Sequence, residues 1–258
     1  MKLSLAEFAR RGGDTGPHID GWGIAFFQDG DAAVLREPTP SAHSSLLQFI
    51  HDQHAPSELV VSHIRKATQG AVSLRNTQPF VRELGGRPHV FAHNGDLGDL
   101  KQRLAPAQSH FRCIGDTDSE HAFCYLLAQL QVLWLAAEAP PLEARVRAFA
   151  RFATHMSTFG SANFLYSDGD YLFVHSHFRR QDDGEYSAPG LYLLQRRSHE
   201  HCLFDAAASE ANEQIALLAS RPLSEENWQP LDAGSILVIQ RGRVIAHHVQ
   251  GEDALEAR

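Results

Sequence analysis

The order of the predicted elements constrains the fold most strongly: strands come first, one pair of helices follows, and strands then return. The turn residues Asp29-Gly30-Asp31 separate two strand-like runs and are typical of a hairpin. Because hairpins take the place of a strand–helix–strand rhythm, this order predicts an α+β layered sandwich. The elements expected in the first half are strands at 22–27, 32–35, 59–64 and 89–92 and a helix at 44–53.

The helix pair in the middle of the chain has clear boundary signals. Thr117-Asp118-Ser119-Glu120 is a helix-start signature with Thr117 as N-cap, and the apolar run 123–137 predicts a long, largely buried helix. Pro140-Pro141 ends it, and 142–156 predicts a second, amphipathic helix. The later strands are expected at 162–166, 171–175, 191–195 and 215–219, with a final hairpin at 235–240 and 243–247. No repeat or linker is visible, which favours a single domain over 1–258.

Composition excludes several classes of function. The chain has 258 residues, of which 43% are hydrophobic, so it can bury a substantial core. A net charge of -8 argues against a nucleic-acid partner or an anionic membrane, and no apolar run approaches the length of a membrane span. The three cysteines are odd in number and predict free thiols in a reducing compartment, so we expect a cytoplasmic protein.

Polar residues follow two of the predicted strands. Arg65 comes directly after the strand at 59–64, and Asn94-Gly95 comes shortly after the strand at 89–92. An Asn amide beside a Gly backbone amide offers two donors to a developing oxyanion, and an Arg offers a forked cation to a carboxylate. Together they predict a site that holds an amino-acid-like substrate and cleaves an acyl bond. Taken alone, Asn-Gly is more often a turn, and a single Arg is more often a surface ion pair.

Metal binding is not predicted, although the chain has 16 histidines. The pairs His18-Ile19-Asp20 and His175-Ser176-His177 have two-ligand spacings that arise often by chance, and no third ligand completes either set. Asp116-Thr117-Asp118 resembles acidic pairs that bind magnesium, but a helix cap is the preferred interpretation of these residues alone.

Four motifs together resemble the class II glutamine amidotransferases, in particular the stand-alone bacterial members that lack a fused synthase domain. The segment from Ala219 to Trp228 is similar to the C-terminal part of that family, so the resemblance covers nearly the whole chain. In order, the motifs are Asp20-Gly21-Trp22-Gly23-Ile24-Ala25, His63-Ile64-Arg65-Lys66-Ala67-Thr68, Phe91-Ala92-His93-Asn94-Gly95 and Gly115-Asp116-Thr117-Asp118-Ser119-Glu120.

This resemblance implies a fold and a role for each matching residue. The fold would be the four-layer αββα sandwich of the N-terminal-nucleophile hydrolases. Arg65 would clamp the α-carboxylate of glutamine, and Asp118 would pair with its α-ammonium group. The side chain of Asn94 and the backbone amide of Gly95 would form the oxyanion hole, and Thr68 would line the glutamine pocket. No cofactor is implied.

The nucleophile of this family is a cysteine that becomes the first residue once the initiator Met is removed. This chain begins Met1-Lys2-Leu3-Ser4-Leu5 instead. We therefore expect that the first strand and the nucleophile lie before Met1, in a segment of roughly ten to fifteen residues, and that the chain as written is inactive. The alternative is a true loss of the nucleophile.

Two functions follow from these expectations. The first is an amidohydrolase that cleaves the γ-carboxamide of glutamine, or a related γ-glutamyl amide, through an N-terminal Cys thioester, with an ammonia-accepting synthase subunit as a candidate partner. The second is a non-catalytic glutamine-binding protein that acts as a sensor or as a subunit of an assembly.

Overall fold

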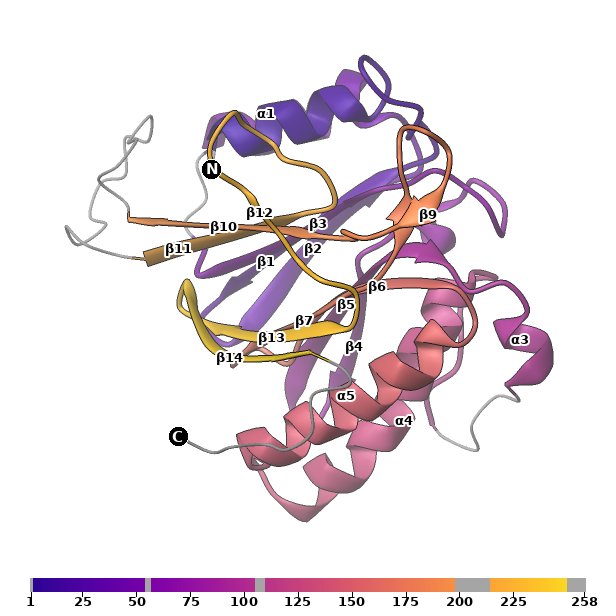
Figure 1. Cartoon of the computed structure of the whole chain (residues 1–258), viewed down its shortest axis with the longest axis vertical. Helices are drawn as coiled ribbons and strands as arrows, with labels where there is room; N and C mark the ends of the chain where they lie inside the picture. The colour runs from indigo at the N-terminus through magenta and orange to yellow at the C-terminus, as the bar shows by residue number, and fades with distance from the viewer. Residues whose placement is uncertain (1, 54–56, 105–109, 198–213, 250–258) are drawn as a thin grey trace.

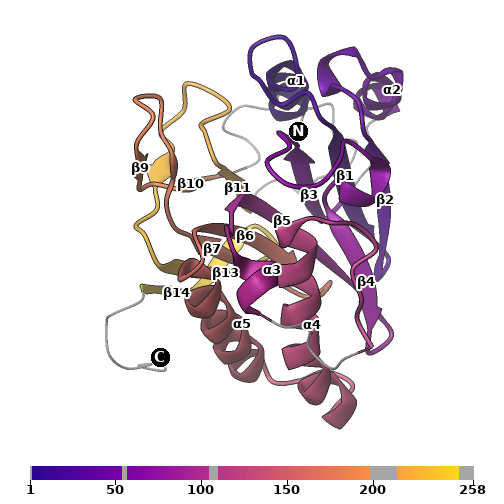
Figure 2. The same cartoon turned by 90° about the vertical axis from the view of Figure 1, so that its right-hand side faces the viewer.

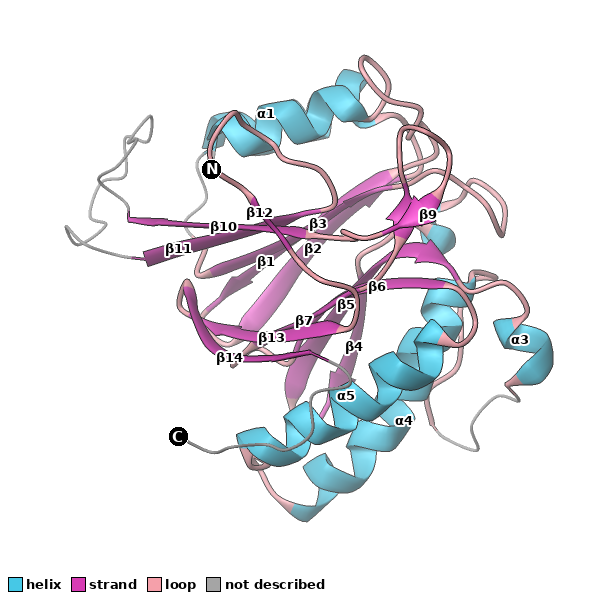
Figure 3. Cartoon of the chain, in the orientation of Figure 1, coloured by secondary structure: helices cyan, strands magenta, loops and turns pink. Residues whose placement is uncertain are grey.

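The protein is a four-layer αββα sandwich (Figure 1). The computed structural model describes residues 2–53, 57–104, 110–197 and 214–249. Two layers of antiparallel sheet lie face to face, with α1 and α2 on one outer side and α4 and α5 on the other (Figures 2 and 3). The layered α+β sandwich predicted from the element order is therefore confirmed.

The first sheet layer begins with a three-stranded sheet in the order β2-β1-β3. β1 is its central strand and is buried on both faces. Trp22 and Ile24 face the helices, and Ala25 faces the six-stranded sheet of the other layer. The predicted hairpin is confirmed, with Asp29 and Gly30 at positive φ in its turn. The elements are α1 (Lys2–Arg11), β1 (Trp22–Gln28), β2 (Asp31–Glu37), η1 (Ser41–His43), α2 (Ser45–Gln53) and β3 (Leu59–Ile64).

A second three-stranded sheet, in the order β11-β10-β12, lies in the same layer. Its Leu193 joins Ala25 and Val61 of the first three-stranded sheet in one apolar cluster against the central sheet. The elements are β10 (Tyr192–Arg197), β11 (Gln214–Ala219) and β12 (Gln229–Pro230), with a short ribbon of β8 (Arg179–Arg180) and β9 (Tyr186–Ser187) beside them.

The central layer is a six-stranded antiparallel sheet in the order β14-β13-β7-β6-β5-β4. Along β5 the side chains alternate between the two cores, with Val90 and Ala92 toward the three-stranded sheets and Phe91 toward α4 and α5. Its strands are β4 (Phe80–Leu84), β5 (Arg87–Asp96), β6 (Ser161–Ser167), β7 (Leu172–Ser176), β13 (Ser235–Gln240) and β14 (Arg243–Val249).

The helices α4 (Asp118–Ala136) and α5 (Leu142–Ser157) cover the outer face of this sheet. The predicted N-cap is confirmed, because the Thr117 side chain accepts a hydrogen bond from Glu120 N at 3.2 Å. α4 is buried through most of its length, although Val132 and Leu135 near its end are exposed. Phe91 stacks on Phe123 with ring centroids 5.1 Å apart, which joins the sheet to α4.

The sequence left some elements unassigned. They are α1, η1, β4, η2 (Leu74–Asn76), α3 (Leu100–Arg103), β8, β9 and β12. None of the helices that the structure describes is long and apolar enough to cross a membrane. The polar tail after Gln250 lies outside the described residues, and the single domain over 1–258 stays a prediction.

A buried ion pair joins α5 to the turn between β6 and β7. Arg145 donates to Asp168 and Asp170 at 2.9 Å each and to the Pro140 carbonyl at 2.7 Å. The Arg145 and Asp168 side chains are 6% and 0% exposed, so each charge depends on the other for its compensation. Burial raises the pKa of Asp168, and Arg145 acts in the opposite direction.

We expect Arg145→Met to lower the free energy of unfolding by about 3 kcal/mol, because Asp168 would keep a buried charge without a partner. Arg147→Met on the exposed side of the same helix is the matched control and should change it by less than about 0.5 kcal/mol. Urea unfolding followed by circular dichroism measures both. Equal losses in the two variants would show that the buried pair is not what stabilises this corner.

Candidate functional site

The end of β5 carries the predicted oxyanion residues. Asn94 lies opposite Asn163, and Gly95 lies opposite Ala162, in the antiparallel register with β6. The expectation that the strand ends at 92 is therefore wrong, and the turn interpretation of Asn94-Gly95 is wrong with it. β5 continues to Asp96 because its pairing with β6 continues to Ser161.

Gly95 is required by close packing rather than by a turn. A Cβ atom at this position would lie 1.9 Å from the Ser161 carbonyl oxygen and 2.6 Å from His93 Nε2. The residue is nevertheless exposed at the surface. The backbone of Gly95 is therefore accessible to solvent at the strand end, without a side chain to cover it. A ligand could approach its peptide group there.

His93 fixes this strand end to α4. Its Nε2 lies 2.9 Å from the Ser161 carbonyl oxygen, which can only accept, so Nε2 carries the proton and Nδ1 accepts from Ser119 Oγ at 2.9 Å. Gln78 adds two bonds, accepting from His93 N at 2.7 Å and donating to His93 O at 3.2 Å. Burial lowers the pKa of His93, so the ring is a neutral support.

Arg65, which follows β3, is buried rather than part of a surface ion pair. Its guanidinium group donates to three backbone carbonyls of the next loop, those of Gln69 (2.9 Å), Gly70 (3.1 Å) and Ala71 (3.1 Å). Burial lowers the pKa of Arg65, and the nearby carboxylates of Asp20 and Asp118 raise it. The loop is thus wrapped around a cation.

Asp118 opens α4 and reaches the segment after β5. Its Oδ2 accepts a hydrogen bond from Leu97 N at 2.7 Å, and its side chain is buried. The Arg65 loop reaches the same segment, since Gln69 Nε2 donates to Asp96 Oδ1 at 3.1 Å. The structure therefore brings the predicted Arg65, Asn94, Gly95 and Asp118 together, with the exposed Thr68 on the connecting loop.

Asn76 is a residue of this region that sequence reasoning missed. Its side chain donates to Ala71 O at 3.0 Å and accepts from Asp116 N at 2.8 Å. It therefore ties the Arg65 loop to the segment that leads into α4. No motif marks it, because its partner Asp116 is a neighbour only in the folded chain.

Asn163 was missed for the same reason, whereas Glu120 was predicted only as part of the start of a helix. Asn163 is buried and donates to Asn94 O at 2.9 Å and to Phe178 O at 2.8 Å. Glu120 accepts from Ile114 N and Gly115 N at 3.0 and 2.7 Å and also binds Arg82. These contacts fix the backbone on both sides of the predicted site.

Two histidines beside the site have a buried ring nitrogen without a hydrogen-bond partner in the described part of the chain, namely Nδ1 of His18 and Nδ1 of His63. Burial lowers the pKa of both histidines. The pKa of His63 falls to about 3, because His18 and His93 lower it further. Both rings are therefore neutral near pH 7.

Within the described ranges, no group of three or more His, Cys, Asp or Glu side chains could hold a metal ion. The His175 and His177 rings stack with centroids 5.9 Å apart, and His175 Nδ1 donates to Ala162 O at 2.7 Å. This pair therefore packs the sheet, and the expectation of no metal or cofactor stays a prediction.

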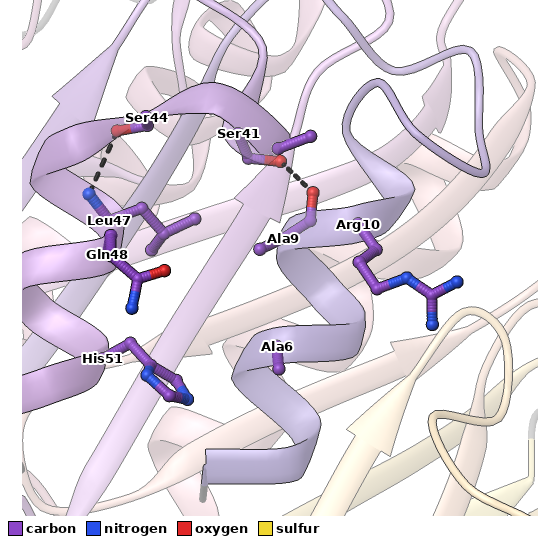
Figure 4. A pocket seen from close by; sticks show the side chains of 9 residues that line it. Ala6, Ala9, Arg10, Ser41, Ser44, Leu47, Gln48 and His51 are labelled. Carbon is purple, nitrogen blue, oxygen red and sulfur yellow. Dashed lines mark hydrogen bonds between the residues drawn. The ribbon is translucent and has the colours of Figure 1, made fainter.

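A pocket of about 210 Å³ lies elsewhere, between α1 and α2 (Figure 4). Ala6 and Ala9 of α1 and Leu47 and His51 of α2 line it, and Ser41 closes one end. None of the predicted site residues reaches it.

Comparison with known proteins identifies the family of this chain. A family model described as class-II glutamine amidotransferases matches residues 1–257, so the chain belongs to that family. The chain is 34% identical over 242 residues to YafJ of Escherichia coli, a candidate glutamine amidotransferase, covering 90% of this chain and 89% of that one. A Haemophilus influenzae protein of the same description is 31% identical, covering 95% and 81%.

Solved structures agree. A predicted glutamine amidotransferase from Pseudomonas aeruginosa superposes with a TM-score of 0.67 at 32% identity, covering 92% of this chain and 91% of that one. The glutamine phosphoribosylpyrophosphate amidotransferase of Bacillus subtilis matches 96% of this chain and 45% of its own, with a TM-score of 0.58 at 15% identity, which shows the fold alone. The predicted αββα sandwich of the N-terminal-nucleophile hydrolase type is confirmed.

We expect Gly95→Ala to lower the free energy of unfolding by about 2 kcal/mol or more, because the added methyl group meets the Ser161 carbonyl and forces β5 and β6 apart. Gly86→Ala is the matched control: its φ of +76° also disfavours a side chain, but nothing lies within 4 Å of the added Cβ. It should lose only about 1 kcal/mol. Equal losses, measured by urea unfolding, would contradict the close-packing argument.

Proposed function

We propose that this protein is the glutaminase unit of a class II glutamine amidotransferase. It binds glutamine, or a related γ-glutamyl amide, by its amino-acid head group and cleaves the side-chain amide. The observation that carries the proposal is the convergence of a buried cation, Arg65, and a buried anion, Asp118, beside Asn94 and Gly95.

The two charges fit a zwitterionic head group. Arg65 has five N–H donors, and the loop carbonyls accept three hydrogen bonds from them, which leaves donors for a carboxylate. Asp118 uses Oδ2 for Leu97 N, which leaves Oδ1 for an ammonium group. A ligand that lacks one of the two head-group charges would leave its buried partner, Arg65 or Asp118, unpaired. The loss of binding free energy would be about 2 kcal/mol or more.

Asn94 and Gly95 are proposed to bind the oxyanion. The Asn94 side chain is half-buried at the strand end, and its backbone is held by Asn163. A donor fixed in this way needs no rearrangement as negative charge develops on the amide oxygen. The same strand end would therefore stabilise the tetrahedral intermediate.

The thiol nucleophile is proposed to come from an N-terminal cysteine on an additional strand. Among the strands that the structure describes, β3 pairs only with β1 and β11 only with β10, so each keeps an unpaired edge in the same layer. A strand along the β3 edge would end near Arg65. Cys113 and Cys124 contact one another beside α4 and are not part of this strand end.

The proposed reaction is balanced by water alone. The cysteine α-amine accepts the thiol proton, and the thiolate attacks the γ-carboxamide carbon. The C–N bond breaks as the protonated amine returns the proton to the departing ammonia. Water then cleaves the γ-glutamyl thioester and restores the thiol. We propose that the ammonia passes to a synthase partner, since an amidophosphoribosyltransferase is 35% identical over 72 residues of this chain.

Ammonia release from glutamine tests the proposal with two proteins: this chain, and the same chain extended upstream to an in-frame Met-Cys. We expect activity only in the extended protein. If the extended protein binds glutamine but releases no ammonia, with its N-terminal cysteine shown free by mass spectrometry, the non-catalytic binding function replaces the enzyme. If it neither binds nor cleaves glutamine or another γ-glutamyl amide, the proposal fails.

We expect Asn94→Ala in the extended protein to lower kcat for glutamine about 100-fold and to leave KM within about threefold, because the oxyanion forms only after binding. Steady-state ammonia release measures both constants. Thr158→Ala, an exposed change next to α5, is the control. An unchanged kcat in Asn94→Ala would remove it from the oxyanion hole.

Arg65→Ala and Asp118→Ala should mainly weaken binding. Each removes one half of the head-group recognition, so we expect KM for glutamine to rise by about tenfold or more in each variant. Arg65→Lys keeps the positive charge but loses the paired N–H donors of the guanidinium group. It should therefore recover only part of the affinity for glutamine. Competition by L-glutamate provides an independent readout, and inhibition equal to that of the parent would contradict both assignments.

A further inference from the structure

Two cysteines outside the proposed site lie in sulfur-to-sulfur contact. Cys113 Sγ and Cys124 Sγ are 3.8 Å apart, and the two thiols are not bonded to one another. Cys113 is exposed on the segment that leads into α4, whereas Cys124 is buried on the second turn of that helix. An exposed thiol is thus placed directly against a buried one.

The neighbouring groups make the two thiols unequal. The hydrogen bond between the two thiols lowers the pKa of Cys113 to about 5; burial raises that pKa, and a hydrogen bond with His121 lowers it. The same contact and burial raise the pKa of Cys124. His121 lies on the same helix three residues before Cys124, and the Cys113 sulfur raises its pKa. The arrangement is an exposed thiol with a lowered pKa, a buried thiol with a raised pKa and an adjacent histidine with a raised pKa.

We propose that Cys113 and Cys124 are a peroxide-reactive dithiol, in which Cys113 is the attacking thiol and Cys124 resolves it as an intramolecular disulfide. The Cys113 thiolate attacks one oxygen of hydrogen peroxide, the O–O bond breaks, and hydroxide leaves as water after taking up a proton. The Cys124 sulfur then attacks the Cys113 sulfenic acid and water leaves. One peroxide and two thiols give one disulfide and two waters.

Closing the bond requires little movement. An S–S bond is about 2.0 Å long, so the sulfurs approach by roughly 1.8 Å. Cys113 is the partner that can move, because Cys124 is fixed in the buried face of α4. The two residues that follow Cys113 donate their backbone N–H groups to Glu120, so the moving segment is already held against the helix.

The disulfide would act on the proposed glutamine site through Gly115. A Cβ atom at Gly115 would lie 2.2 Å from Asn76 Oδ1 and 2.8 Å from Arg75 O, so this backbone has no room to shift without moving Asn76. Asn76 in turn holds Ala71, whose carbonyl binds Arg65. Resting on the proposed function, we expect oxidation to raise KM for glutamine by about fivefold and to leave kcat within twofold.

The chemistry is tested first without any activity measurement, in a chain with Cys202→Ser. Stoichiometric hydrogen peroxide at pH 6 should remove two hydrogens from the protein mass and give one peptide pair linked through Cys113 and Cys124. The reaction should run at least about tenfold faster in the folded chain than in the same chain unfolded in urea, where Cys113 has an ordinary pKa. Added Cys113→Ser should abolish the fast oxidation, and added Cys124→Ser should leave a sulfenic acid that dimedone traps.

Three results would overturn the dithiol: no linked peptide, equal rates in the folded and unfolded chains, or fast oxidation of Cys124 in Cys113→Ser. The effect of the disulfide on the proposed site is tested separately, by measuring KM for glutamine in the Met-Cys-extended protein with Cys202→Ser. Two versions are compared, one with Cys113 and Cys124 present and one with both replaced by Ser. A disulfide that forms without changing KM removes the regulatory effect and leaves the dithiol. An extended protein without glutaminase activity removes the proposed function, while the mass result still decides the dithiol.

Discussion

The pairing of β5 with β6 is the constraint on which both the core and the proposed site depend. It places Phe91 against α4 and α5 and Val90 and Ala92 against the three-stranded sheets, so one strand joins both apolar layers. The same register continues to its end, where Gly95 fits against Ser161 only because it has no side chain. The core and the proposed site therefore share one strand, and the end of that strand is held in place by its pairing with β6.

The second constraint is a buried cation held by backbone carbonyls. Arg65 has lost its hydration, and the loop 69–71 replaces water with three carbonyl oxygens. Asn76 closes this loop onto the segment before α4, and Asp118 places a carboxylate at the start of that helix, where the helix dipole favours negative charge. The proposed site for a zwitterion thus lies where three chain segments are tied together by polar contacts.

The sequence predicted the layers and most elements because hairpin turns, a capped helix and period-two strands are local signals. It missed α1, and it ended β5 too early because Asn94 and Gly95 resemble a turn when read without β6. The residues of the proposed site could be named from the sequence because short motifs carry them. Asn76 and Asn163 could not, since they bind partners 40 and 69 residues away and have no local signature. The contact between Cys113 and Cys124 depends on the same kind of long-range fit.

The central claim is that Arg65 and Asp118 together recognise the head group of an amino acid. Calorimetric titration of this chain with L-glutamine, and with the two analogues that lack either its α-amino or its α-carboxylate group, tests that claim most directly. The account predicts saturable binding of glutamine and a loss of at least about tenfold in affinity for each analogue. Equal affinity for all three ligands, or no binding of glutamine, would contradict it.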